Sequence, residues 1–148
     1  MTYTDLSQAL YQFWSQFEWD GSPIPVYKQG HVPEDADGNV IASFPYITFS
    51  VGMGDFGGES VQTAFVWCKQ SEGMNVNAQR AAILDQIAQQ IPPEVGRLYR
   101  LANGGAVWIR RNVDFMSDYS PTTKENEATT VDGEPIIGGR ISYILRTF

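Results

Sequence analysis

Few side chains in this sequence could do chemistry together. His31 and Cys68 are the only histidine and the only cysteine. These counts exclude zinc clusters built from cysteine and histidine, and any Ser-His-Asp triad would have to use His31. That histidine stands beside Gly30 in a predicted loop, where a solvated side chain is favoured. Cys68 lies in an apolar, strand-like run, so we expect a buried and inert thiol.

Paired carboxylates are the other groups that could act as acid and base. Asp55 with Glu59, and Asp114 with Asp118, are close enough in sequence for such a pair. Both pairs stand in or beside predicted loops, where carboxylates are normally solvated. The sequence therefore predicts no catalytic site, no cofactor and no metal, and a protein that is not an enzyme.

Two turn-like segments resemble ligand loops in part. Asp35, Asp37 and Asn39 alternate like the first half of a calcium loop, but no glutamate follows at the twelfth position and no helices flank them. Residues 52–58 are rich in glycine, yet they lead into another strand rather than into a helix N-terminus. Each segment is therefore predicted to be a hairpin connection.

The elements that position these residues follow from hydrophobic periodicity. A helix is predicted over residues 5–17, with Thr4 as its N-cap, because the apolar residues form one stripe of a 3.6-residue period. A second helix is predicted over residues 76–90, with Asn75 or Asn77 as its N-cap. Extended or alternating patterns predict an edge or loop piece at 24–28 and strands at 44–51, 61–68, 97–101, 106–111 and 140–147.

This order of elements predicts an α+β fold, with a largely antiparallel sheet and two helices packed on one face. We expect a single domain over residues 1–148. Residues 116–135 are polar and are predicted to form a long loop, which is uncommon in a compact domain unless it is functional. The side chains expected in a common core are Phe13, Trp14, Ile47, Phe49, Phe65, Ile83, Ile87 and Ile91.

Charge and hydropathy narrow the function further. The formal net charge is −7, and the acidic excess lies within residues 1–79. Such a chain is unsuited to coating nucleic acid, because phosphate binding needs clustered Lys and Arg. No run approaches the roughly 20 apolar residues of a membrane span, and no signal peptide is recognisable. We therefore expect no membrane contact and a chain that stays in the cytoplasm where it is made.

Several core and turn motifs, taken in order, resemble one family of structural proteins. The resemblance covers roughly residues 3–148, and the chain looks like the tail terminator proteins of long-tailed, siphophage-type bacteriophages. The motifs that carry it are Phe44-Pro45-Tyr46-Ile47-Thr48-Phe49, Gly54-Asp55-Phe56, Phe65-Val66-Trp67, the helix 76–91 ending at Ile91-Pro92, the Gly104-Gly105 turn and Val107-Trp108-Ile109-Arg110.

The resemblance implies a non-enzymatic virion protein, assembled in the host cytoplasm, at the head-proximal end of the tail. Its copies would form a hexameric ring that caps the tail tube, ends tail polymerisation and offers a surface for joining the head. The implied partners are further copies of the chain, the tail tube protein and a head-neck connector protein. DNA would pass through the ring without tight binding.

Candidate interface residues come from one arginine pair and from the polar segment. Arg110 and Arg111 are neighbours on a predicted strand, so their side chains face opposite ways. A structural or interface role is therefore favoured over a phosphate site. The acidic segment is expected to line the ring's channel, or to reach the tail tube or a neighbouring subunit. Its candidate residues are Asp118, Tyr119, Lys124, Glu125, Glu127, Asp132 and Glu134.

Two alternative functions remain open. The alternative among structural proteins is a neck or head-closure protein of the same particle. A carbohydrate-binding module would stack Trp14, Trp19, Trp67 or Trp108 on sugar rings. Trp14 and Trp67 fall on predicted core faces, which leaves Trp19 as the best exposed candidate. Two or more exposed, coplanar aromatic rings would favour sugar binding, whereas a ring-shaped oligomer would favour the terminator.

Overall fold

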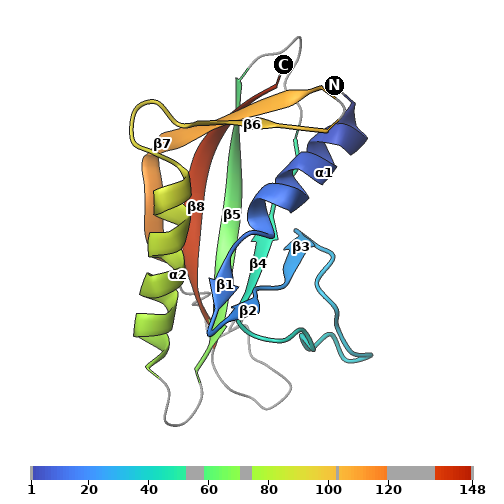
Figure 1. The fold of residues 1–148 in the computed structure, drawn as a ribbon. Helices are drawn as coiled ribbons and strands as arrows, with labels where there is room; N and C mark the ends of the chain where they lie inside the picture. Colours follow the sequence, from blue (N-terminus) through green and yellow to red (C-terminus); the bar gives the residue numbers. More distant parts are fainter. Residues whose placement is uncertain (1, 53–58, 71–74, 103, 120–135, 148) are drawn as a thin grey trace.

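The computed structural model describes residues 2–52, 59–70, 75–102, 104–119 and 136–147 (Figure 1). These residues form an α+β fold with two helices, α1 (Tyr3–Trp14) and α2 (Val76–Gln90). The strands are β1 (Glu18–Trp19), β2 (Ser22–Pro23), β3 (Val26–Lys28), β4 (Tyr46–Phe49), β5 (Glu59–Lys69), β6 (Arg97–Arg100), β7 (Ala106–Tyr119) and β8 (Ile136–Thr147).

Six of these strands form one curled sheet in the order β3-β4-β5-β8-β7-β6. All neighbours pair antiparallel except β3 and β4, which are parallel, so the sheet is mixed but mostly antiparallel. The strands β1 and β2 form a separate small hairpin. Therefore β3 lies at one edge of the main sheet, and β7 with the short β6 lies at the other.

The helices contact different parts of the sheet. Figure 1 shows α1 beside β3 and β4, and α2 running along β8 and β5. The buried side chains of both helices belong to one hydrophobic cluster with residues of the main sheet. Its helical members are Leu6, Ala9, Leu10, Phe13, Trp14, Val76, Ile83, Leu84 and Ile87.

Local capping explains where the helices begin. The hydroxyl of Thr2 accepts a hydrogen bond from the Asp5 N–H at 3.1 Å, and the Asp5 carboxylate accepts one from the Thr2 N–H at 3.0 Å. This reciprocal capping box makes Thr2 the N-cap, so the prediction of Thr4 was wrong. The second helix matches its predicted bounds, and Asn75 caps it by accepting from the Ala78 N–H.

The predicted hairpin turn near residue 37 is confirmed. Glu34 and Val40 form an antiparallel bridge across it. One carboxylate oxygen of Asp35 accepts hydrogen bonds from the backbone N–H groups of Asp37, at 3.0 Å, and Asn39, at 2.9 Å. These bonds, the one from Asn39 above all, lower the pKa of Asp35. The carboxylate therefore holds a turn together, as in an Asx-turn.

Residues 116–119, predicted as loop, are instead the end of a strand. Met116 to Tyr119 pair with Ile141 to Gly138, so β7 and β8 are both longer than their hydrophobic patterns indicated. Ladder hydrogen bonds satisfy the backbone here whatever the polarity of the side chains. The rest of the predicted loop, 120–135, lies outside the described residues.

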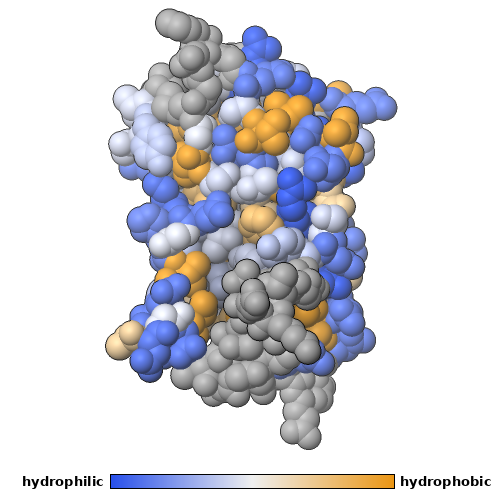
Figure 2. All heavy atoms as spheres, turned by 180° about the vertical axis from the view of Figure 1, so that it is seen from behind, coloured by the Kyte–Doolittle hydropathy of each residue, from blue (hydrophilic) through white to orange (hydrophobic). Residues whose placement is uncertain are grey.

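Strand β5 divides its side chains between two faces. Gln62, Ala64, Val66 and Cys68 are buried, whereas Phe65 lies half-buried on the other face. The prediction of Phe65 as core was therefore wrong, while the other seven expected core residues all belong to the cluster. The reason is that β5 is apolar on both faces, and a period of two does not say which face turns inward. Figure 2 shows the molecule from behind, with apolar patches among hydrophilic side chains.

This assignment predicts different costs for two phenylalanine truncations. Phe13→Ala empties a fully buried site and should lower the free energy of unfolding by about 3–5 kcal/mol. Phe65→Ala removes ring contacts at a half-buried face and should cost about 1–2 kcal/mol. Urea unfolding followed by circular dichroism measures both. Equal losses, or a larger loss at Phe65, would contradict the assignment of faces.

Candidate functional site: two edges of the sheet

The side chains that usually bind metal ions do not cluster in the described part of the chain. Within it, no three His, Cys, Asp or Glu side chains lie close enough to hold a metal ion. Cys68 is fully buried, which confirms the sequence prediction, and burial raises the pKa of its thiol to about 11. The thiol is therefore protonated at neutral pH and shielded from reagents.

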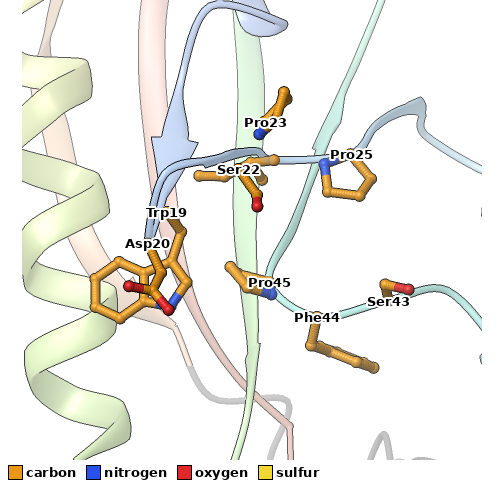
Figure 3. A pocket seen from close by; sticks show the side chains of 9 residues that line it. Trp19, Asp20, Ser22, Pro23, Pro25, Ser43, Phe44 and Pro45 are labelled. Atoms are coloured by element: carbon orange, nitrogen blue, oxygen red, sulfur yellow. The ribbon is translucent and has the colours of Figure 1, made fainter.

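A shallow cavity lies between the β1–β2 hairpin and the segment before β4 (Figure 3). Trp19 and Asp20 line one side of it, and Phe44 and Pro45 line the other. Its volume is about 310 Å³, and the remaining wall consists of serines, prolines and Ile24. Asp20 is the only carboxylate among the lining residues, so the cavity holds no acid–base pair.

An aromatic cluster occupies the face of the sheet opposite the core. We call Phe65, Trp67 and Tyr119 the outer aromatic cluster. The rings of Phe65 and Trp67 stack with centroids 5.4 Å apart and planes 22° apart, and the Tyr119 ring meets them at 61° and 83°. Thr48 fixes the indole by accepting a hydrogen bond from its Nε1 at 3.0 Å. The indole packs closely against Gly138. A Cβ at that position would lie 3.1 Å from the Trp67 ring, so a larger residue would crowd it.

The outer aromatic cluster contains Tyr119, a candidate interface residue, and Trp67, a candidate sugar-binding tryptophan. Tyr119 pairs with Gly138 across β7 and β8, which carries its ring to Trp67. The assignment of Trp67 to a core face was wrong, because its neighbours Val66 and Cys68 take the inward positions. The prediction for Trp14 is confirmed, since its side chain is fully buried.

The two candidate arginines face opposite ways, as predicted, and both have partners within the chain. Arg110 forms an ion pair with Glu59 at 2.8 Å on the outer face. Arg111 donates to two carbonyl oxygens at the end of α2, those of Ile91 at 2.6 Å and Ala88 at 2.9 Å. A cation at a helix C-terminus also interacts favourably with the helix dipole. Arg111 therefore fastens β7 to α2.

Of the remaining candidate residues in the polar segment, only Asp118 lies among the described residues. Asp118 forms an ion pair with Arg80 of α2 at 3.2 Å, and Arg80 also donates to the carbonyl oxygen of Gly138. The Asp118 side chain nevertheless stays largely exposed. The other candidates lie outside the described residues: Lys124, Glu125, Glu127, Asp132 and Glu134.

A wide bulge interrupts β7 at the edge of the sheet. Arg111 pairs with Tyr143 and Met116 with Ile141, so residues 112–115 stand opposite Ser142 alone. We call these four residues the β7 bulge. At its outermost point Val113 is completely exposed, at 102% of its reference area. Nothing in the sequence pattern indicated the bulge.

Polar contacts on each side hold the β7 bulge in place. Asn112 donates to the hydroxyl of Ser142 and to the carboxylate of Asp114, both at 3.1 Å. Arg140 of β8 forms an ion pair with Asp114 at 3.0 Å. The hydrogen bond that Arg140 donates to Asp114 lowers the pKa of this carboxyl group. The carboxylate therefore remains charged at lower pH than a free aspartate.

The opposite edge of the sheet carries a cavity. The α1 cavity, of about 290 Å³, lies between α1 and the strands β3 and β4. Its lining residues are Ser7, Gln8, Tyr11, Gln12, Lys28 and Phe49. Tyr11 and Tyr3, on the same helix, are each about half exposed. The ammonium group of Lys28 lies 5.0 Å from the centre of the Tyr3 ring and 3.3 Å from its hydroxyl.

The state of Cys68 predicts its reactivity. At pH 8 the thiol should react with a disulfide reagent at least about a hundredfold more slowly in the native protein than in urea, from the difference in ionisation alone. Absorbance of the released thiolate follows the reaction. A native rate within tenfold of the unfolded rate would show that the thiol is accessible.

The contacts of Arg111 predict a structural role. Arg111→Met keeps the aliphatic stem but removes the guanidinium donors from the carbonyl groups of Ile91 and Ala88, and leaves Ala88 with only the Ile91 N–H as donor. The free energy of unfolding should fall by about 1.5–3 kcal/mol. Arg100→Met, at an exposed position of β6, is the control and should change it little. Equal effects of the two substitutions in urea unfolding would argue against the role of Arg111.

Comparison of the chain with protein-family models, with curated proteins and with solved structures finds no match. No helix among the described residues is long and apolar enough to cross a membrane. The two unlike sheet edges, the outer aromatic cluster and the sequence motifs are thus the features from which a function is proposed.

Proposed function

We propose that this chain is a non-enzymatic structural protein of a virion, of the tail terminator type. Its copies form a ring that caps the tail tube, ends tail polymerisation and presents the surface for head joining. The observation that carries the proposal is the presence of two different open surfaces on opposite edges of one sheet. The motifs along residues 3–148 that resemble tail terminators give the ring its place in the particle.

Opposite and unlike edges suit a ring. A two-fold dimer needs one patch that complements itself, whereas a ring needs two different patches that meet head to tail. One patch here is the α1 cavity with Tyr11, beside the edge strand β3. The other is the β7 bulge with Val113, at the far side of the sheet. Copies placed edge to edge would bring unlike patches together.

The backbone of β7 also supports assembly. Its residues 106–109 pair with β6, but beyond Ile109 no described strand pairs with its outer edge. Unpaired strand edges are usually shortened, charged or covered, because they invite other chains to pair. A neighbouring copy in the ring would cover this edge.

The arrangement of layers supplies surfaces for the other partners. We propose that both helices pack on the same face of the sheet, which is supported by the single cluster that their buried residues share. The other face would then remain open to the tail tube protein or to a head-neck connector protein. It carries the outer aromatic cluster and Val61, which is 60% exposed. Aromatic residues and arginine are enriched where protein surfaces meet.

Charge is consistent with a passage for DNA. The net charge of −7 gives the phosphate backbone little to bind, so DNA would slide past rather than adhere. This fits a ring around a channel better than a protein that coats nucleic acid.

The test is the oligomeric state of the purified protein. Light scattering should give a mass several times that of the 16.5 kDa chain, and negative-stain microscopy should show rings with a central opening. Rings should also bind preformed tail tubes at their ends, which a neck or head-closure protein would not do. A protein that remains monomeric or stops at a two-fold dimer would contradict the proposal.

Carbohydrate binding is a second candidate, favoured by one observation. The outer aromatic cluster borders a cavity of about 290 Å³ that also includes Gln29 and Glu34. However, the rings of Phe65 and Trp67 stack on each other, so they do not form the coplanar platform that a sugar ring would use. Saturable quenching of tryptophan fluorescence by oligosaccharides, lost in Trp67→Ala, would favour this candidate over the ring.

A further inference from the structure

We propose that Val113 of one copy inserts into the α1 cavity of the next copy, and that this contact joins the subunits. The inference rests on the proposed ring and names the two surfaces that would form it. Both are complete in the described chain, yet they lie on opposite edges of the sheet. Val113 therefore cannot reach the α1 cavity of its own copy, and a second copy is the occupant that the chain itself offers.

Val113 has the properties of an anchor residue. Full exposure of a valine contributes nothing to the stability of the single chain, and the bulge that lifts it out interrupts the ladder between β7 and β8. The bulge is nevertheless held by the contacts of Asn112 with Ser142 and of Asp114 with Arg140. Bulges that aim a side chain outward are typical of functional positions. The valine is thus presented in a fixed position.

The α1 cavity is suited to an aliphatic side chain. Two aromatic residues line this open cavity: Phe49, which is almost completely buried, and Tyr11, which is about half exposed. The volume of about 290 Å³ exceeds that of one valine side chain, so neighbouring atoms of the β7 bulge would enter with it. Burying Val113 there would remove apolar surface of both copies from water.

Charge complements the apolar fit. At the rim of the cavity, Lys28 has the Tyr3 ring and hydroxyl as neighbours but no carboxylate among the described residues. Asp114 follows Val113 directly, and its side chain is 55% exposed despite the ion pair with Arg140. Docking of Val113 would bring this carboxylate towards the rim that carries Lys28. An exposed pair of this kind orients a contact and weakens as salt is added.

The contact is head to tail, which allows a decisive mixing experiment. Val113→Asp replaces the inserted apolar side chain with a charged one and leaves the cavity intact. Tyr11→Asp places a charge in the lining of the cavity and leaves Val113 intact. Both positions are exposed, so both variants should fold. Val61→Asp, an exposed valine on β5 away from either edge, is the matched control. Circular dichroism and thermal unfolding confirm that all variants are folded.

We expect rings from the wild-type protein and from Val61→Asp, and monomers from the other two variants alone. An equimolar mixture of Val113→Asp and Tyr11→Asp should give dimers and nothing larger. In that mixture only one intact valine meets one intact cavity, so growth stops after a single contact. Analytical ultracentrifugation with mass photometry distinguishes these species.

Several results would overturn the inference. Rings formed by Val113→Asp would show that other surfaces join the copies, and the proposed ring function would stand without this contact. A mixture that stays monomeric, or a wild-type protein that is monomeric at the highest concentration reached, would also overturn it. Conversely, wild-type chains that assemble into open filaments, with the mixture still giving dimers, would support the contact and contradict the ring.

Discussion

The antiparallel ladder between β5 and β8 is the interaction on which the rest of the structure depends. It extends from Glu59 paired with Arg146 to Lys69 paired with Ile136, and it brings residues far apart in sequence into one central register. Because successive side chains alternate between faces, this register decides which residues enter the core.

Two glycines in β8 adapt this ladder to bulky neighbours on both faces. A Cβ at Gly139 would lie 2.9 Å from Leu84 of α2, and one at Gly138 would lie 3.1 Å from the Trp67 ring. Helix α2 therefore approaches one face closely while the outer aromatic cluster rests on the other. A single pair of adjacent glycines thus serves the core and the exposed face at once.

The sequence predicted local features well and long-range choices poorly. The bounds of α2 followed from periodicity, and side chains that bond their own backbone limited its cap to Asn75 or Asn77, of which the structure has Asn75. The inward face of β5 did not, because Phe65 and Val66 are both apolar and only packing against α2 chooses between them. The full length of β7 was hidden because pairing with β8, not hydropathy, carries it to Tyr119.

The candidate surfaces were the least predictable part, for the same physical reason. Arg110 and Arg111 were expected to face opposite ways from strand geometry alone, and they do. Their partners come from β5 and α2, which no local pattern specifies. The β7 bulge likewise needs Ser142 and Arg140 from another strand to exist. The sequence around Val113 therefore did not indicate that this side chain would be exposed, or that contacts with β8 would hold it in position.

The fixed position of Val113 would favour assembly, because ordering a mobile side chain on binding costs conformational entropy. A side chain on a loose loop must be ordered when it docks, which reduces affinity, whereas a preorganised one avoids that cost. Arg111 ties β7 to the end of α2 just before the bulge, and Met116 rejoins the ladder just after it. Val113 is therefore positioned by contacts that already stabilise the single chain. The interactions that close the fold at this edge would then also prepare it for a neighbour, so loss of Arg111 should weaken assembly even though its side chain points towards α2.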